Sequence, residues 1–167
     1  MLPLPPAVLE SFMREALAEA EAAGLAGELP IGAIVVIAGE VISRGRSRQR
    51  ERRTQLAHAE LEALLGGGEP LLARHDEAVL FTTVEPCPLC LGAAVMADVP
   101  HIVFALADAT AGVPEAVESV PYVRRHIESY SGGLLASESR ALIARYQPGL
   151  LRYVDPDEPT HGATLTG

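Results

Sequence analysis

The 167-residue sequence predicts a single α/β domain built on a mixed β-sheet with helices on both faces. Three observations predict this class. Apolar residues near the N-terminus follow a helical period, two strand-like segments then flank a tight turn, and helical and strand-like segments alternate after that. Because 49% of the residues are apolar, the chain can build one sizeable core.

The first expected elements are a helix and a pair of antiparallel strands. Residues 7–23 carry apolar side chains on one helical face, and two glycines follow them. Residues 31–37, IGAIVVI, are β-branched and almost entirely apolar, which indicates a buried strand. A Gly-Glu turn then leads into a second strand at residues 40–46.

The later elements alternate between helix and strand, which favours parallel pairing in this part of the sheet. Residues 111–133 fit either a strand or a short helix. The other expected elements are a helix at 57–65 that stops at three glycines, a strand at 78–84, a helix from Pro88 to about Ala97, a strand at 101–106, and a helix at 135–146 capped by Ser137.

We assign residues 1–150 to the domain and residues 151–167, which are acidic and rich in Pro, Gly and Thr, to a flexible C-terminal tail. No run of apolar residues is long enough for a transmembrane helix, and the N-terminus lacks the basic region of a signal peptide. We therefore expect a cytoplasmic protein without a membrane partner, whose thiols stay reduced.

The charge is strongly acidic overall but unevenly distributed. A net charge of −9 argues against binding nucleic acid through bulk electrostatics. All 13 basic residues are arginines, and six of them lie at residues 44–53, so this segment carries about +5 and the remainder about −14. The segment is either a solvated loop or a contact for an anion such as phosphate.

The only two cysteines, Cys87 and Cys90, lie in the segment VEPCPLC. This placement is consistent with a metal site, a redox pair or core packing. At the start of a helix, free N–H groups and the helix dipole favour thiolates, which are the form that zinc binds. Because zinc needs three or four ligands, a histidine is required nearby.

Among the five histidines, His58 is the candidate ligand. It opens the helix at 57–65, and Glu60 follows two residues later. His-x-Glu followed, after a strand, by Pro-Cys-x-x-Cys is the signature of zinc nucleobase deaminases. The other four histidines are interpreted as ordinary surface or core residues.

With these motifs the sequence resembles the cytidine-deaminase-like superfamily, and within it the branch of tRNA adenosine deaminases, guanine deaminases and fungal-type cytosine deaminases. The resemblance covers roughly residues 7–147. It rests on LPIGAIVVIAGEVISRGRS, AHAELEAL, TTVEPCPLCLGAAVMADVPHIVFA and GGLLASESRALIARY. It implies a three-layer α/β/α sandwich around a mixed five-stranded sheet, and a homodimer.

The resemblance also implies the chemistry. A Zn²⁺ ion held by His58, Cys87 and Cys90 keeps one position open, which is typical of a catalytic site. Glu60 is placed to carry the proton between water, the ring nitrogen and the departing ammonia. The expected reaction hydrolyses a guanine-, cytosine- or adenosine-type amino group to a carbonyl, with a small nucleobase or nucleoside as substrate.

By the same resemblance, one set of residues is expected to bind the substrate: Pro30, Gly32, Ser47, Ala57, Val84, Glu85, Phe104 and Asp108. For Phe104 the alternative is core packing, and for Asp108 it is a surface position. Ser47 stands where relatives usually carry an asparagine, and its single hydroxyl cannot offer an amide's paired donor and acceptor. Leu56 likewise stands where a small polar residue is usual. Both changes concern the substrate rather than the zinc chemistry.

Three alternatives remain open at this point. The terminal helix and the arginine-rich segment favour a tRNA adenosine deaminase, whereas the acidic charge and the lost asparagine disfavour it. A zinc-stabilised interaction protein without turnover would not need Glu60. Thiol-disulfide chemistry at the two cysteines would leave the His-Ala-Glu segment unexplained.

Overall fold

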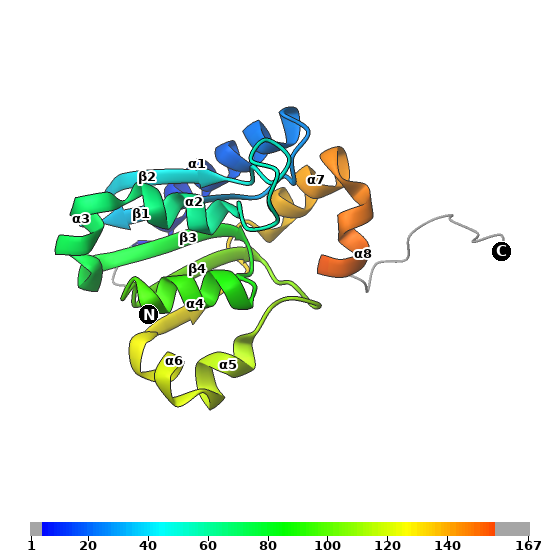
Figure 1. Cartoon of the computed structure of the whole chain (residues 1–167). Helices are drawn as coiled ribbons and strands as arrows, with labels where there is room; N and C mark the ends of the chain where they lie inside the picture. Colours follow the sequence, from blue (N-terminus) through cyan, green and yellow to red (C-terminus); the bar gives the residue numbers. More distant parts are fainter. Residues whose placement is uncertain (1–4, 156–167) are drawn as a thin grey trace.

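The computed structural model describes residues 5–155, and its centre is a five-stranded sheet in the order β2-β1-β3-β4-β5 (Figure 1). β1 pairs antiparallel with β2 and β3, whereas β4 pairs parallel with both β3 and β5, so the sheet is mixed. The strands are β1 (Gly32–Ile37), β2 (Glu40–Arg46), β3 (Ala78–Val84), β4 (His101–Leu106) and β5 (Ser129–Ser131).

Helices cover both faces of this sheet, which confirms the expected three-layer α/β/α sandwich (Figure 1). Alternate strand residues point to opposite faces, so Val35 packs toward α2 and α4 whereas Ile34 packs toward α1. One outer layer holds α2 (Ala59–Gly66), α3 (Gly68–Ala73) and α4 (Pro88–Met96), and the other holds α1 (Pro6–Leu25) and α7 (Ala136–Tyr146).

Several short elements differ from the sequence prediction. α2 ends at Gly66, in the glycine run where the helix was expected to stop, but Gly67 keeps a helical backbone, with φ −64° and ψ −30°, and an additional helix, α3, follows at once. The ambiguous residues 111–133 form both kinds of structure. They contain the helices α5 (Pro114–Ser119) and α6 (Pro121–His126), followed by β5.

The predicted cap at Ser137 is wrong. α7 begins at Ala136, and the residue before it, Leu135, has a left-handed backbone with φ 57° and no capping side chain. After α7 the chain forms η2 (Pro148–Leu150) and α8 (Leu151–Val154), and Val154 is buried. The first residues assigned to the C-terminal tail are therefore helical, and residues 156–167 of that assignment lie outside the described part.

Two glycines let the outer helices pack directly onto the sheet backbone. A Cβ atom on Gly45 of β2 would lie 2.2 Å from the carbonyl oxygen of Ala59 in α2. A Cβ atom on Gly32 of β1 would lie 2.2 Å from the carbonyl oxygen of Ala16 in α1. Since only glycine permits such close approach, Gly45 fixes the position of the first turn of α2.

Within residues 5–155, no helix combines the length and the apolar character that crossing a membrane requires.

Candidate metal centre and catalytic cavity

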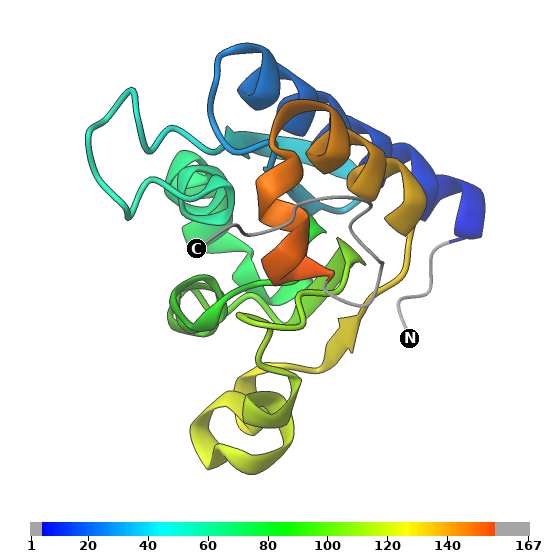
Figure 2. The same ribbon diagram turned by 90° about the vertical axis from the view of Figure 1, so that its right-hand side faces the viewer.

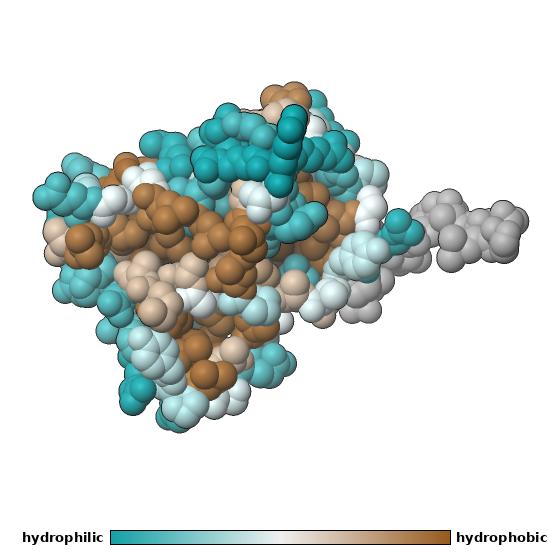
Figure 3. Space-filling model, in the orientation of Figure 1, coloured by the Kyte–Doolittle hydropathy of each residue, from teal (hydrophilic) through white to brown (hydrophobic). Residues whose placement is uncertain are grey.

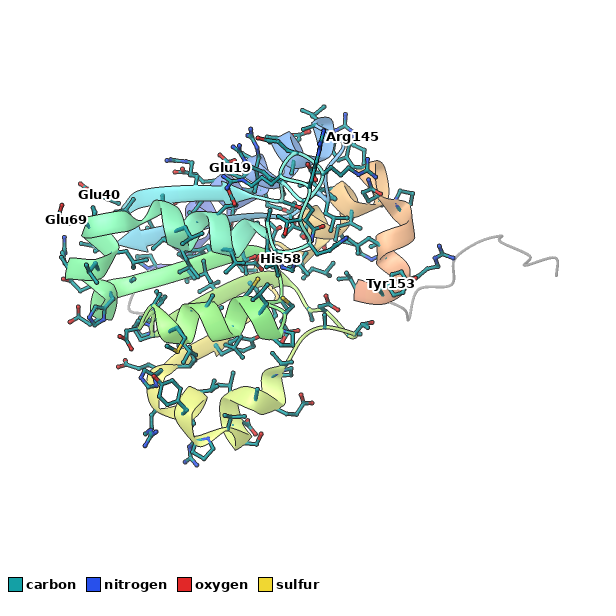
Figure 4. The ribbon with its side chains drawn as sticks, in the orientation of Figure 1. Glu19, Glu40, His58, Glu69, Arg145 and Tyr153 are labelled. Atoms are coloured by element: carbon teal, nitrogen blue, oxygen red, sulfur yellow. The ribbon has the colours of Figure 1, made fainter. Side chains whose placement is uncertain are left out.

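Three potential metal ligands from two helix starts converge at one end of the sheet. His58 and Cys87 immediately precede α2 and α4, and Cys90 lies in the first turn of α4. Nδ1 of His58 lies 3.6 Å from Sγ of Cys87 and 3.3 Å from Sγ of Cys90. The two sulfurs lie 3.6 Å apart. The sequence-predicted ligands are thus close together, and Figure 4 shows His58 at the start of α2.

This cluster has the dimensions of a zinc site. With Zn–S bonds of 2.3 Å and Zn–N bonds of 2.0–2.1 Å, a tetrahedral ion separates two sulfurs by about 3.8 Å and a sulfur from a nitrogen by about 3.6 Å. The observed separations agree with these values to about 0.3 Å. Among the described residues, this is the one group of three or more His, Cys, Asp or Glu side chains whose ligand atoms all lie within 4.8 Å of one another. The donor set fits zinc with one position left for a non-protein ligand.

The electrostatics of the cluster favour a deprotonated sulfur. Hydrogen bonds from the thiol of Cys90 and from His58 lower the pKa of Cys87 to about 4. The same contact with Cys87, together with burial, raises the pKa of Cys90. The hydrogen bond to Cys87 also raises the pKa of His58. The Cys87 sulfur is therefore ready to bind a cation, whereas Cys90 releases its proton when a metal binds.

Glu60 places a buried carboxyl group beside this cluster. Its side chain is only 4% exposed, and the hydroxyl of Thr82 on β3 donates a hydrogen bond of 3.1 Å to its Oε1. Burial raises the pKa of Glu60, because the charged carboxylate is poorly solvated there. A carboxyl group with raised proton affinity, next to a metal site, is suited to accept and return a proton.

A cavity of about 170 Å³ lies next to the cluster, and Glu60 is among its lining residues, so a ligand in the cavity could reach the carboxyl group. Its walls are mainly apolar, and its polar side chains come from several distant parts of the chain. The lining residues are Leu29, Ile31, Ser47, Gln49, His58, Ala59, Glu60, Val84, Glu85, Cys87, Asp108, Ala111, Leu150 and Val154.

Ser47 is the most informative of the predicted substrate residues in this cavity. It is 2% exposed, and its backbone N–H donates to the carbonyl of Ile31 at 3.0 Å. Its Oγ has no hydrogen-bond partner. Among the described residues it is the one buried side-chain nitrogen or oxygen atom that lacks such a partner. Leaving a buried hydroxyl unpaired costs about 1–3 kcal/mol, so this position suits a polar ligand atom.

Glu85 and Asp108 also line the cavity, but their carboxylates already have partners. Glu85 accepts hydrogen bonds from the backbone N–H of Asp108 and from the hydroxyl of Tyr130, both at 3.0 Å. Oδ1 of Asp108 accepts the backbone N–H groups of Thr110 and Ala111 at 2.9 and 2.8 Å. Both side chains therefore shape the loop after β4.

The remaining predicted substrate residues, Pro30, Gly32, Ala57 and Phe104, do not line the cavity. The ring of Phe104 packs in the core, 5.1 Å from that of Tyr130 between centroids. Gly32 accommodates α1, and the carbonyl of Ala57 accepts the N–H of Arg48 at 3.0 Å. Val84 is both buried and part of the wall.

Sequence reasoning missed several lining residues. Leu29 and Ile31 are the neighbours of Pro30, so the prediction identified the correct segment but the wrong residue within it. Gln49 lies in the arginine-rich segment, whose charge pattern indicates a solvated loop or an anion contact and not a cavity wall. Leu150 and Val154 come from the C-terminal end of the described chain, where no local pattern indicates contact with a site 60 residues or more away.

The arginine-rich segment is largely neutralised by carboxylates of the same chain. Four of its six arginines form ion pairs: Arg44 with Glu15, Arg46 with Glu19 at 3.6 Å, Arg48 with Glu51 at 3.1 Å, and Arg52 with Glu62 at 2.7 Å. The buried carboxylate of Glu28 accepts the backbone N–H groups of Arg50 and Glu51 and so holds the loop in place.

Comparison with known proteins confirms the expected family. Residues 6–106 match the family model described as the cytidine and deoxycytidylate deaminase zinc-binding region. A tRNA-specific adenosine deaminase of Bacillus subtilis is 33% identical over 140 residues, covering 82% of this chain and 87% of that protein. A tRNA:A34 deaminase structure matches with a TM-score of 0.68 and 36% identity, over 79% of this chain and 98% of that one. The guanine deaminase of Bacillus subtilis matches with a TM-score of 0.55 and 27% identity, over 67% and 76%.

Some relatives are much longer than this chain. A protein of Deinococcus radiodurans named tRNA(Ile)-lysidine synthase is 45% identical over 116 residues, which are 66% of this chain but only 19% of that protein. The match therefore concerns one portion of that relative.

The metal centre predicts which histidine is needed for zinc. His58→Ala should lower the zinc content of the purified protein from about one ion per chain to near zero, because two sulfurs alone do not complete the site. His75→Ala, a histidine in η1 (His75–Glu77) outside the cluster, is the matched control and should keep the metal. Elemental analysis by mass spectrometry provides the measurement. Full zinc occupancy in His58→Ala would contradict the assigned ligands.

Proposed function

The chain belongs to the cytidine and deoxycytidylate deaminase zinc-binding family, and from this premise we propose that its substrate is a small free nucleobase or nucleoside. It is a zinc-dependent hydrolytic deaminase, which replaces an amino group by a carbonyl and releases ammonia. The observation that carries the substrate proposal is the small volume of the cavity beside the metal ligands. Its volume of about 170 Å³ lies below the roughly 300–1,000 Å³ of pockets for drug-sized ligands.

Glu60 is the proposed proton carrier of the reaction. Zinc bound at His58, Cys87 and Cys90 supplies a Lewis acid that makes water a nucleophile near neutral pH. Glu60 can take a proton from water and deliver it to the ring nitrogen, and can then take the proton of the newly added hydroxyl group and deliver it to the departing amino group, which leaves as ammonia. The hydrogen bond from Thr82 fixes the orientation of the carboxyl group, and burial favours its protonated form. An acid–base group with a raised pKa suits both transfers.

Ser47 is the proposed polar contact for the substrate. Its unpaired hydroxyl can donate to a ring nitrogen or accept from a ring N–H group. Val84, Glu85 and Asp108 contribute to the wall of the same cavity. Pro30, Gly32, Ala57 and Phe104 do not line the cavity, so we propose that they act indirectly, by keeping the lining segments in place.

Loss of the carboxylate at position 60 should abolish turnover without loss of zinc. Glu60→Gln preserves the shape of the side chain but cannot carry the proton, so kcat should fall by about 100- to 10,000-fold. The assay is ammonia release from adenine, guanine, cytosine and their nucleosides, with zinc content measured in parallel. An active wild-type protein whose Glu60→Gln variant keeps full activity would contradict the role of Glu60.

Deamination of adenosine within tRNA is the second candidate, because relatives of this chain bear the name tRNA-specific adenosine deaminase. The charges of this chain support it poorly. The net charge is −9, and the one segment rich in arginine has most of its cations paired with Glu15, Glu19, Glu51 and Glu62. Binding of a polyanion would have to compete with these contacts.

Binding to tRNA should therefore be weak, and it should not show the steep loss of affinity with rising salt concentration that a specific complex shows. A protein that contacts several phosphates loses about 1,000-fold or more in affinity between 50 and 200 mM salt. We expect no complex with a tRNA transcript at micromolar protein in gel shifts at either salt concentration. A band that forms at 50 mM and disappears at 200 mM salt would favour the tRNA substrate.

We further propose that the protein is cytoplasmic and forms a homodimer through the face carrying α2, α3 and α4. Figure 3 shows a broad apolar area over these helices, below the hydrophilic arginine-rich loop. Each of these helices has an exposed apolar side chain, and Leu65, Leu72 and Met96 are 72–79% exposed. Large exposed apolar areas commonly mark association surfaces, and a second copy can cover this one.

The dimer should be lost when charge is added to this face. Leu65→Glu with Met96→Glu places two carboxylates where the proposed interface is apolar, so light scattering should change from twice the mass of one chain to that mass. Leu25→Glu on α1, which is 72% exposed in the wild type, is the control and should remain dimeric. A monomeric wild-type protein at micromolar concentration would exclude the dimer.

A further inference from the structure

We propose that residues 148–155, which we call the C-terminal cover, admit a free base to the zinc cavity and exclude the same base when it is joined to a sugar. This inference rests on the proposed function and narrows its substrate class to the nucleobase. It comes from three features of the structure. The cover lines the cavity, it is tied to the loop after β4, and it also lines a larger neighbouring cavity.

The local sequence explains why the chain turns over the cavity. Gln147 precedes Pro148, and a residue before proline is driven out of the helical region. Its backbone angles are accordingly φ −143° and ψ 63°, and α7 ends at Tyr146. η2 and α8 then lead the chain back across the end of the sheet, as Figure 2 shows for α8.

Two apolar side chains of the cover form part of the cavity wall. Leu150 and Val154 both line the zinc cavity, as His58 and Cys87 do. Val154 is 3% exposed and packs in a small core cluster with Val84, Leu106 and Ile143. Leu150 packs against the same cluster. The cover is thus a packed part of the fold. It would contact a ligand through the apolar side chains of Leu150 and Val154.

The cover is also tied to the loop that follows β4. The N–H of Ala109 donates to the carbonyl of Val154 at 3.0 Å, and the hydroxyl of Thr110 donates to the carbonyl of Tyr153. At the end of the cover, Asp155 accepts a hydrogen bond of 2.7 Å from Nε of Arg140. These contacts hold α8 against the loop after β4, which lines the same cavity. α8 and this loop therefore form one wall of the cavity together.

A second cavity of about 450 Å³ adjoins the zinc cavity. It shares Glu85, Asp108 and Val154 with the zinc cavity, so these residues stand between the two spaces. The zinc cavity alone, at about 170 Å³, suits a single heterocycle. A sugar attached to that heterocycle requires additional space, and displacement of Val154 would join the two cavities.

Closure over a free base would also serve the reaction. Apolar side chains over the ring exclude water other than the reacting molecule, and electrostatic interactions with Glu60 are stronger in such a site. A nucleoside or a nucleotide within RNA would keep the cover displaced and lose this benefit. The discrimination therefore acts at two stages, through the fit of the substrate and through the exclusion of water.

Shortening the two lining side chains tests the proposal. We expect the wild-type protein to have a higher kcat/KM for one free base among adenine, guanine and cytosine than for the corresponding nucleoside. Leu150→Ala with Val154→Ala should change this base-to-nucleoside ratio at least tenfold toward the nucleoside. Leu142→Ala in α7 is the matched control, because it shortens a partly buried leucine that does not line the zinc cavity. It should leave the ratio unchanged.

Hydrogen exchange provides a readout that does not depend on turnover or on the stability of the double variant. In the otherwise unmodified Glu60→Gln protein, the saturating free base should slow exchange of the Ala109 amide, which donates to Val154. The corresponding nucleoside should leave this amide unprotected or speed its exchange. Both probes are compared at the same zinc occupancy.

Two results would overturn the cover as the selective element. One is a Glu60-dependent enzyme that uses the nucleoside as well as the free base. The other is a double variant with zinc and wild-type secondary structure whose base-to-nucleoside ratio equals that of Leu142→Ala, together with no base-dependent protection of Ala109. Either leaves the deaminase function intact. A protein inactive on all six compounds contradicts the proposed function itself, and the inference that rests on it.

Discussion

The close packing of α2 and α4 on the sheet is the constraint on which the rest of the site depends. Gly45 allows the backbone of α2 to approach β2, and Nδ1 of His58, just before α2, lies 3.3–3.6 Å from the sulfurs of Cys87 and Cys90 at the start of α4. Zinc coordination tolerates errors of only a few tenths of an ångström. A small rotation of either helix would therefore separate the ligands, and the rigidity of the three layers is part of the chemistry.

Buried carboxylates organise the space around this centre, each in a different way. Glu60 lies beside the metal ligands and has a raised pKa, so it is suited to carry a proton. Glu28 binds backbone N–H groups of the arginine-rich loop, and Glu85 binds Tyr130 and the loop after β4. Burial of a carboxylate is costly unless its hydrogen bonds are made. Glu28 and Glu85 meet this condition and shape the cavity walls, whereas Glu60 remains available for a reaction.

The distribution of charge and apolar surface separates this chain from a typical polyanion-binding protein. Its arginines are concentrated in one segment, yet four of the six there are paired with glutamates of α1, α2 or the segment itself. The wall of the cavity instead includes hydrocarbon from Leu29, Ile31, Leu150 and Val154. These features favour recognition of a small planar molecule through shape and a few polar contacts. The unpaired hydroxyl of Ser47 is the clearest of those contacts.

The sequence by itself determined the order of the main elements, the mixed α/β class and the metal ligands. Hydrophobic periodicity and the His-x-Glu and Pro-Cys-x-x-Cys motifs are local signals, so they can be recognised without knowledge of the packing. Only the tertiary structure decided which side chains face the cavity. Phe104 turned into the core, Gly32 served helix packing, and Val154 reached the zinc cavity from the C-terminal side. The physical reason is that side-chain direction at such positions is set by contacts between segments distant in the chain, which no local pattern records.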